Sequence, residues 1–156
     1  FEVSVTAVAS RAREGDDLVD RVHGITEVYD LLPHHDVVVL ITPLNEQTSE
    51  LVDERFLAAM PEGALVVNMA RGKVVKTDAL VDATRGGRIS AALDVTDPEP
   101  LPPDHPLWRC PSVLISPHVG GATAAFRPRA VRLLQSQLQR YVEGAPLENV
   151  VAGPGA

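Results

Sequence analysis

Four short apolar runs, separated by longer stretches, most strongly constrain the fold of this chain. Residues 37–41, 64–68, 89–95 and 113–115 are rich in aliphatic and β-branched side chains, which favours β-strands. The run over 37–41 has no apolar–polar alternation, so it predicts a strand covered by helices on both faces. Strands that alternate with helix-length segments predict a parallel sheet, and the predicted fold class is therefore α/β.

The remaining elements follow from the same patterns. Residues 3–9 predict another strand, which ends near Ser10 and Arg11 and is followed by a polar connection. Residues 53–60 and 77–84 predict two helices, each ended by a glycine-containing turn. From Phe126 the apolar residues recur at helical spacing, which predicts one long amphipathic helix that ends at Gly144, with Pro128 in its first turn.

Composition limits the classes of partner. With 156 residues and 45% hydrophobic residues, the chain fits one domain with a substantial core. Its net charge of −7 argues against nucleic acid and anionic membranes as partners. Cys110 is the single cysteine, so the expected compartment is a reducing cytoplasm. No signal peptide or apolar run of roughly 20 residues is visible. Since the chain opens with Phe1, directly before an apolar run, we expect it to be the later part of a longer protein.

Three side chains that suit acid chemistry follow successive apolar runs. Arg71 follows residues 64–68, Glu99 follows residues 89–95, and His118 follows residues 113–115. An arginine can bind a carboxylate through two parallel hydrogen bonds, and a histidine paired with a glutamate can transfer a proton near neutral pH. Because the carboxyl ends of parallel strands share one edge, the sequence predicts one site there for a small 2-oxo or 2-hydroxy acid.

Three ordered motifs resemble one enzyme family. Residues 66–75, 91–102 and 116–123 are similar to the D-isomer-specific 2-hydroxyacid dehydrogenases, and the similarity runs from about Val3 to the end of the chain. Residues 93–96 and 99–107 look most like glyoxylate/hydroxypyruvate reductases. The resemblance implies an incomplete, Rossmann-like, doubly wound parallel sheet with a long C-terminal helix. It divides the chain into a partial dinucleotide-binding domain over 1–122 and a helix and tail over 123–156.

The resemblance also implies catalytic roles. Arg71 is expected to bind the substrate carboxylate, and His118 to exchange a proton with the substrate oxygen. Glu99 is expected to pair with His118 and to favour the protonated imidazole. Alternatively, Glu99 is a solvated carboxylate. The hydride comes from nicotinamide, so no metal is implied.

Cofactor contacts are implied in the same way, with Asp94 expected at the carboxamide unless it only caps a strand end. The residues expected to line the dinucleotide are Thr42, Pro43, Met69, Ala70, Arg71, Asp94, His118, Gly120 and Gly121. Ser10 and Arg11 stand where NAD-preferring relatives carry an acid, and Arg13 is close in sequence. A hydroxyl and a guanidinium suit a 2′-phosphate, so NADP(H) is favoured and NAD(H) is possible.

One family motif is missing from this sequence. The G-x-G-x-x-G turn after a first strand does not occur in the chain, so the predicted dinucleotide domain lacks that strand and the turn that binds pyrophosphate. The leading hypothesis is an NAD(P)-dependent enzyme that acts as a homodimer on a small 2-oxo or 2-hydroxy acid. The alternatives are a non-catalytic dinucleotide sensor and an inert fragment of the enzyme.

Overall fold

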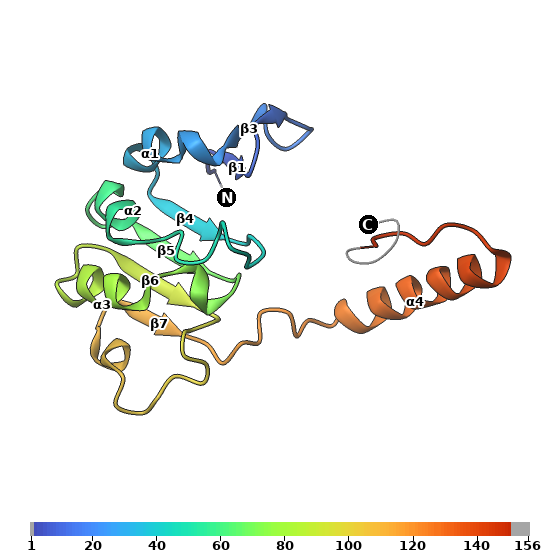
Figure 1. Cartoon of the computed structure of the whole chain (residues 1–156). Helices are drawn as coiled ribbons and strands as arrows, with labels where there is room; N and C mark the ends of the chain where they lie inside the picture. Colours follow the sequence, from blue (N-terminus) through green and yellow to red (C-terminus); the bar gives the residue numbers. More distant parts are fainter. Residues whose placement is uncertain (1, 151–156) are drawn as a thin grey trace. The chain divides into compact units, whose positions relative to one another are not determined.

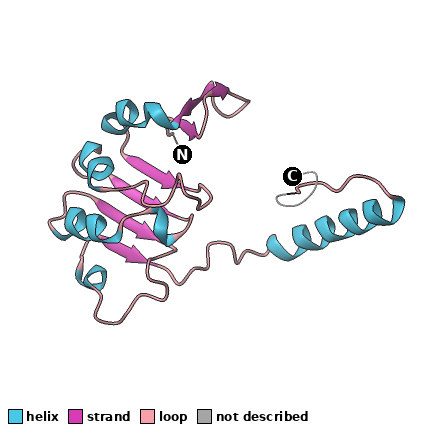
Figure 2. Cartoon of the chain, in the orientation of Figure 1, coloured by secondary structure: helices cyan, strands magenta, loops and turns pink. Residues whose placement is uncertain are grey.

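The computed structural model describes residues 2–150, and the chain forms two compact units, Phe1–His118 and Val119–Ala156. The first unit contains a four-stranded parallel sheet in the order β4-β5-β6-β7 (Figures 1 and 2). Its strands are β4 (Val37–Leu40), β5 (Leu65–Asn68), β6 (Ser90–Leu93) and β7 (Val113–Ile115). These are the four strands that the apolar runs predict, and the α/β fold class is confirmed.

Two helices connect the strands and form the main core with one face of the sheet. They are α2 (Glu54–Ala59), between β4 and β5, and α3 (Thr77–Arg85), between β5 and β6. Val66 and Leu93 of the sheet are buried together with Leu57 of α2 and Leu80 of α3. Both helices occur where the sequence predicts them, because each carries apolar residues at the spacing that this face requires.

The other face of β4 is open. Val37, Val39 and Ile41 point away from the core and are 49%, 52% and 78% exposed. The prediction that residues 37–41 are covered on both faces is therefore wrong. An apolar run without alternation indicates only that both faces of the strand are apolar. Whether a helix covers each face depends on elements elsewhere in the chain.

Both ends of α2 are held by side chains from outside the helix. Asp53 accepts a hydrogen bond from the backbone N–H of Phe56 (2.8 Å) at the start of the helix. At the other end, the Arg88 guanidinium donates to the carbonyl oxygens of Met60 (3.1 Å) and Leu57 (2.5 Å). Lys76 hydrogen-bonds Glu54 (2.8 Å), which lowers the pKa of the Glu54 carboxyl and raises the pKa of Lys76.

Replacing Arg88 with Ala is expected to lower the free energy of unfolding by about 1–3 kcal/mol, because two carbonyl groups lose a charged donor. Urea unfolding followed by circular dichroism measures the change. Arg85→Ala is the matched control, since Arg85 is exposed at the end of α3. Equal losses from the two variants would contradict a specific role of Arg88 at the end of α2.

A smaller sheet precedes β4 along the chain. Its strands are β1 (Ala7–Ala9), β2 (Arg13–Glu14) and β3 (Arg21–Gly24), in the order β1-β3-β2. The strand predicted over 3–9 is therefore confirmed only over its last three residues. The connection predicted after it contains β2, β3, the one-turn helix α1 (Val28–Leu31) and two 3-10 helices, Ile25–Glu27 and Leu32–His34.

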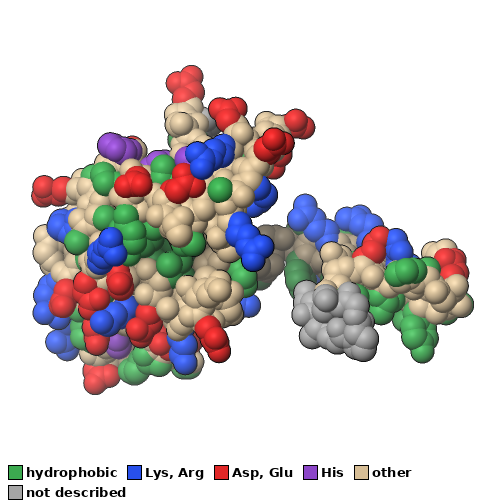
Figure 3. Space-filling view, turned by 45° about the horizontal axis from the view of Figure 1, so that its top comes forward, with side chains coloured by type: hydrophobic (Ala, Val, Ile, Leu, Met, Phe, Trp, Pro, Cys, Tyr) green, Lys and Arg blue, Asp and Glu red, His purple; other side chains and the backbone are tan. Residues whose placement is uncertain are grey.

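The second unit contains one long helix, α4 (Phe126–Glu143). Pro128 is its third residue, and Gly144 follows it in the left-handed conformation (φ 68°), as predicted. Leu134, Leu138 and Tyr141 are among its exposed apolar residues, and Figure 3 shows hydrophobic side chains at the surface of this unit. Within residues 2–150, no helix is both long and apolar enough to cross a bilayer.

Candidate active site

Four loops leave the same edge of the four-stranded sheet. They follow β4, β5, β6 and β7 and carry Thr42, Arg71, Glu99 and His118, respectively. Because the four strands are parallel neighbours, their carboxyl ends lie side by side. Ligands of open α/β sheets bind at such an edge.

The loop after β5 is shaped by a buried amide. The Asn68 side chain is 1% exposed, accepts a hydrogen bond from the Ala70 N–H (3.0 Å) and donates one to the Arg71 carbonyl oxygen (3.0 Å). Because both the oxygen and the nitrogen of this buried amide are hydrogen-bonded, Asn68 fixes the backbone of the loop that contains Arg71. Asn68 lies within the first sequence motif, but an amide side chain at the end of a strand does not by itself indicate a catalytic or binding residue.

A cavity of about 450 Å³ lies between the loops after β4 and β5. It is lined by Ile41, Thr42, Pro43, Leu44, Met69, Ala70 and Arg71. Five of the residues predicted to meet the cofactor or substrate therefore share one cavity: Thr42, Pro43, Met69, Ala70 and Arg71. The Arg71 side chain is turned onto its own loop, where its guanidinium donates to the Ala70 carbonyl oxygen (2.6 Å).

Glu99 and His118 are in direct contact. Glu99 Oε1 lies 2.6 Å from His118 Nδ1, and the two side chains are 41% and 46% exposed. Because an ionised carboxylate only accepts hydrogen bonds, Nδ1 is the donor. His118 has a φ of 55°, the left-handed conformation that few residues other than glycine adopt. This pair leaves Nε2 as the imidazole atom that is not directed at Glu99.

Asp94 and the segment before His118 are also joined. The Ser116 hydroxyl donates to Asp94 Oδ1 (2.6 Å), and the His118 N–H donates to the Ser116 carbonyl oxygen (3.0 Å). Ser116 therefore links the loop after β6 to the loop after β7. The predicted Gly120 and Gly121 belong to the second unit, where residues 119–123 form tight turns.

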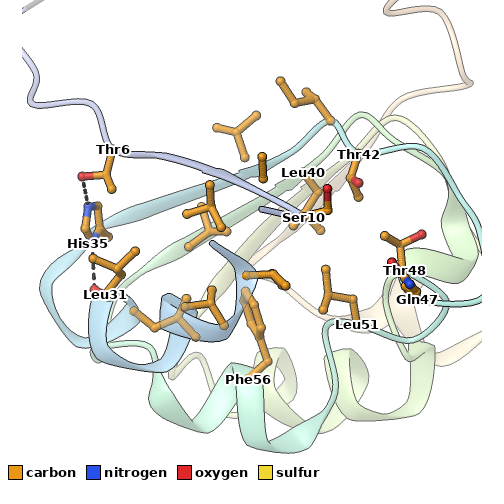
Figure 4. Close-up of a pocket in the computed structure, with 18 of the residues that line it drawn as sticks. Thr6, Ser10, Leu31, His35, Leu40, Thr42, Gln47, Thr48, Leu51 and Phe56 are labelled. Atoms are coloured by element: carbon orange, nitrogen blue, oxygen red, sulfur yellow. Dashed lines mark hydrogen bonds between the residues drawn. The ribbon is translucent and has the colours of Figure 1, made fainter. Parts of the chain in front are cut away.

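A second cavity, of about 520 Å³, lies between β1 and β4. Figure 4 shows Thr6 and Ser10 on the β1 side, Leu40 and Thr42 on the β4 side, and Phe56 below them. At one end, His35 Nδ1 donates to the Leu31 carbonyl oxygen, so Nε2 accepts from the Thr6 hydroxyl; both distances are 2.8 Å. Ser10 is exposed at the other end, and Arg11, the next residue, is also exposed.

Acidic and basic side chains are intermixed on the face of the first unit that Figure 3 presents. Across residues 2–150, no three or more His, Cys, Asp or Glu side chains come together in a group that could hold a metal ion.

The fold and the site define a class of protein: an α/β domain with a Rossmann-like parallel sheet and polar loops at its carboxyl edge. The model of the D-isomer specific 2-hydroxyacid dehydrogenase NAD binding domain matches residues 1–120. The chain belongs to the D-isomer specific 2-hydroxyacid dehydrogenase family, as its three motifs predict.

The relatives of this chain are named for more than one activity. A glyoxylate reductase from Thermofilum pendens is 41% identical over 120 residues, which are 76% of this chain and 35% of the relative. The chloroplastic/mitochondrial formate dehydrogenase of Arabidopsis thaliana is 34% identical over 134 residues, which are 84% of this chain and 35% of that protein. This chain therefore spans about a third of the length of both relatives.

A solved structure matches the fold. The D-isomer specific 2-hydroxyacid dehydrogenase from Xanthobacter autotrophicus Py2, in complex with NADPH and MES, is 36% identical and superposes with a TM-score of 0.78. The match covers 90% of this chain and 58% of that one. The shared architecture is the parallel sheet and the helices that pack on it.

Proposed function

We propose that the whole protein to which this chain belongs reduces a small 2-oxo acid of the glyoxylate or hydroxypyruvate type to the D-2-hydroxy acid. The observation that carries this proposal is the 2.6 Å contact between Glu99 and His118, on the sheet edge where Arg71 is also located. A cofactor pocket alone does not need this proton-transfer pair. The glyoxylate reductase among the relatives supports the choice of substrate class.

Each side chain has a defined task in this proposal. Arg71 binds the substrate carboxylate, exchanging its bond to the Ala70 carbonyl for two charge-assisted bonds. Glu99 accepts the Nδ1 hydrogen bond of His118 and stabilises the imidazolium. Nε2 of His118 then gives its proton to the substrate carbonyl oxygen, and takes it back in the reverse reaction.

The residues around the site fit a dinucleotide. Thr42, Met69 and Ala70 line the same cavity as Arg71. Asp94 accepts a hydrogen bond from Ser116, and Ser116 lies two residues before His118 along the chain. Pro43 lines that cavity as well. From the family motif we propose that His118, Gly120 and Gly121 also contact the cofactor. When bound, the nicotinamide supplies the hydride that reduces the carbonyl carbon.

We assign residues 1–122 to a partial dinucleotide-binding domain that lacks the first strand and the glycine-rich turn, and residues 123–156 to a C-terminal helix and tail. The support is the 520 Å³ cavity between β1 and β4, which are edge strands of two separate sheets. Residues 1–156 alone are therefore expected to bind dinucleotide poorly and to show no turnover, in contrast to the whole protein.

A steady-state assay of the whole protein tests the function. Glyoxylate, hydroxypyruvate and a panel of larger 2-oxo acids are offered with NADPH and with NADH, and oxidation of the cofactor is followed by absorbance. Turnover of a small 2-oxo acid is the expected result. Absence of turnover with every pair would reject the enzyme and leave the non-catalytic sensor.

The cofactor preference gives a separate prediction. Ser10→Asp is expected to lower the ratio of kcat/KM with NADPH to kcat/KM with NADH by about tenfold, because a carboxylate at the end of β1 repels a 2′-phosphate. Ser4→Asp adds the same charge at another exposed position and should leave the ratio unchanged. An unchanged ratio in Ser10→Asp would remove Ser10 and Arg11 from the 2′-phosphate site.

We further propose that the whole protein is a homodimer in the cytoplasm. Cys110, the single cysteine of this sequence, is buried and free, which suits a reducing compartment. Light scattering coupled to size-exclusion chromatography of the whole protein measures its mass, and a monomer mass would reject the dimer.

A further inference from the structure

The loop that carries Glu99 is exposed where it meets His118. Residues 98–100 are exposed, and the ion pair itself is about half exposed. Exposed ion pairs contribute little to stability because water and salt screen them. The attraction between Glu99 and His118 therefore does little to order the loop backbone, and contacts elsewhere along the loop contribute to its position.

Thr77 makes such a contact from outside the loop. Its hydroxyl donates a hydrogen bond of 2.8 Å to the carbonyl oxygen of Asp97, two residues before Glu99. Thr77 is the first residue of α3, and the next turn of that helix inserts Ala79, Leu80 and Val81 into the core. The donor therefore stands on a rigid element, whereas the acceptor belongs to an exposed loop.

The base of the same loop is fixed by close packing. A Cβ atom on Gly72 would lie 1.9 Å from the carbonyl oxygen of Thr96, so the backbones of the two loops are in direct contact. One residue later, Asp97 meets Thr77. The contacts at Thr96 and Asp97 therefore fix the backbone immediately before the segment that carries Glu99.

We propose that Thr77 is a positioning residue for the proposed reaction: its hydrogen bond to Asp97 holds Glu99 at hydrogen-bond distance from His118. This inference rests on the function proposed above, because it assigns Thr77 to the same site. Thr77 does not touch substrate or cofactor in this role. It acts through Glu99, which in turn orients the imidazole ring and its tautomer.

Kinetics of the whole protein test the proposal with matched variants. Thr77→Val keeps the shape of the side chain and removes the donor, so kcat is expected to fall by about tenfold with KM unchanged. Thr77→Ser keeps the donor and should restore kcat to within about twofold of the wild type. Asp78→Asn changes the exposed neighbour on α3 and should have no effect.

A double variant separates positioning from general damage. If Thr77 acts through Glu99, Thr77→Val adds no further loss of kcat in a Glu99→Gln background. Equal activities of Thr77→Val and Thr77→Ser, or additive losses in the double variant, would overturn the inference.

A second measurement does not require activity. Long-range ¹H–¹⁵N spectra of the imidazole ring report which nitrogen of His118 carries the proton in the neutral form. Thr77→Val is expected to increase the Nε2–H tautomer, and Thr77→Ser to leave the Nδ1–H tautomer dominant. If the wild type lacks turnover but the spectra respond in this way, the proposed function fails and the positioning role stands. Identical spectra for all variants would reject the positioning role.

Discussion

Replacing His118 with Gln in the whole protein is expected to lower kcat by about 10²- to 10⁴-fold, a much larger effect than the change in the Kd of the reduced cofactor. Glutamine keeps a polar group near Glu99 but cannot transfer a proton near neutral pH. The loss therefore falls on the chemical step. Stopped-flow measurement of cofactor oxidation gives kcat, and quenching of cofactor fluorescence gives Kd.

His34→Gln is the control for this experiment, because His34 is an exposed histidine at the end of a 3-10 helix away from the loops after the strands. Its kcat should equal that of the wild type. A His118→Gln variant with more than about a third of the wild-type kcat would remove His118 from proton transfer and, with it, the main support for the proposed reaction.

Replacing Gly72 with Ala is expected to lower the free energy of unfolding by about 1–3 kcal/mol, as overpacking does in tightly packed regions. The added Cβ would lie 1.9 Å from the Thr96 oxygen and 2.2 Å from the Thr96 carbonyl carbon. Both atoms belong to the backbone, so no side-chain rotation relieves the overlap. The loop carrying Glu99 must move, and kcat should fall with the stability.

Gly86→Ala is the matched control for the glycine substitution. Gly86 has a φ of −84°, and apart from its chain neighbours and the adjacent helix backbone, no described atom lies within 4 Å of the position that its Cβ would take. Alanine is expected to leave stability unchanged or slightly higher there. Urea unfolding of the two variants gives the comparison. Equal stabilities would mean that the Gly72 and Thr96 backbones do not pack rigidly against each other.

The elements around the main core could be predicted because their local signals agree with the tertiary structure. The runs that form β4 to β7 are apolar on the face that packs on α2 and α3, and Asp53 occupies the N-cap that the start of α2 requires. For α4, helical spacing, Pro128 in the first turn and Gly144 at the end all indicate the same boundaries.

The segment from Arg11 to Asp36 could not be predicted for the opposite reason. Strands β2 and β3 are two and four residues long, and α1 is four residues long. Strands β4 to β7 are equally short, but they lie in mainly apolar runs. In contrast, β2 is Arg13–Glu14 and β3 has Val22 as its one aliphatic residue, so the sequence there predicts a polar connection. Val22 is an isolated apolar position, whereas Val28 and Leu32 recur with Ile25 and Tyr29 at helical spacing. That repeat spans only about two turns, and it forms α1 and the 3-10 helices on either side of it.

The residues of the candidate site could also be predicted only in part. The strand ends place Arg71, Glu99 and His118 on one edge of the sheet, so the sequence could indicate their neighbourhood. Asn68, Thr77 and Ser116 could not be singled out, because their roles depend on hydrogen bonds to groups that only the folded loops bring near. Small polar residues are also common in turns, where no such contact exists.

The hydrogen bond from Arg71 to the Ala70 carbonyl has a consequence for selectivity. This carbonyl occupies an N–H donor of the guanidinium, so an incoming molecule that uses the same donor must form a stronger bond than a neutral amide oxygen does. A carboxylate meets that condition through its charge and its two parallel acceptors. A neutral aldehyde or ester offers only another uncharged oxygen. If Arg71 binds substrate as proposed, the protein thereby discriminates against uncharged carbonyl compounds before any chemistry begins.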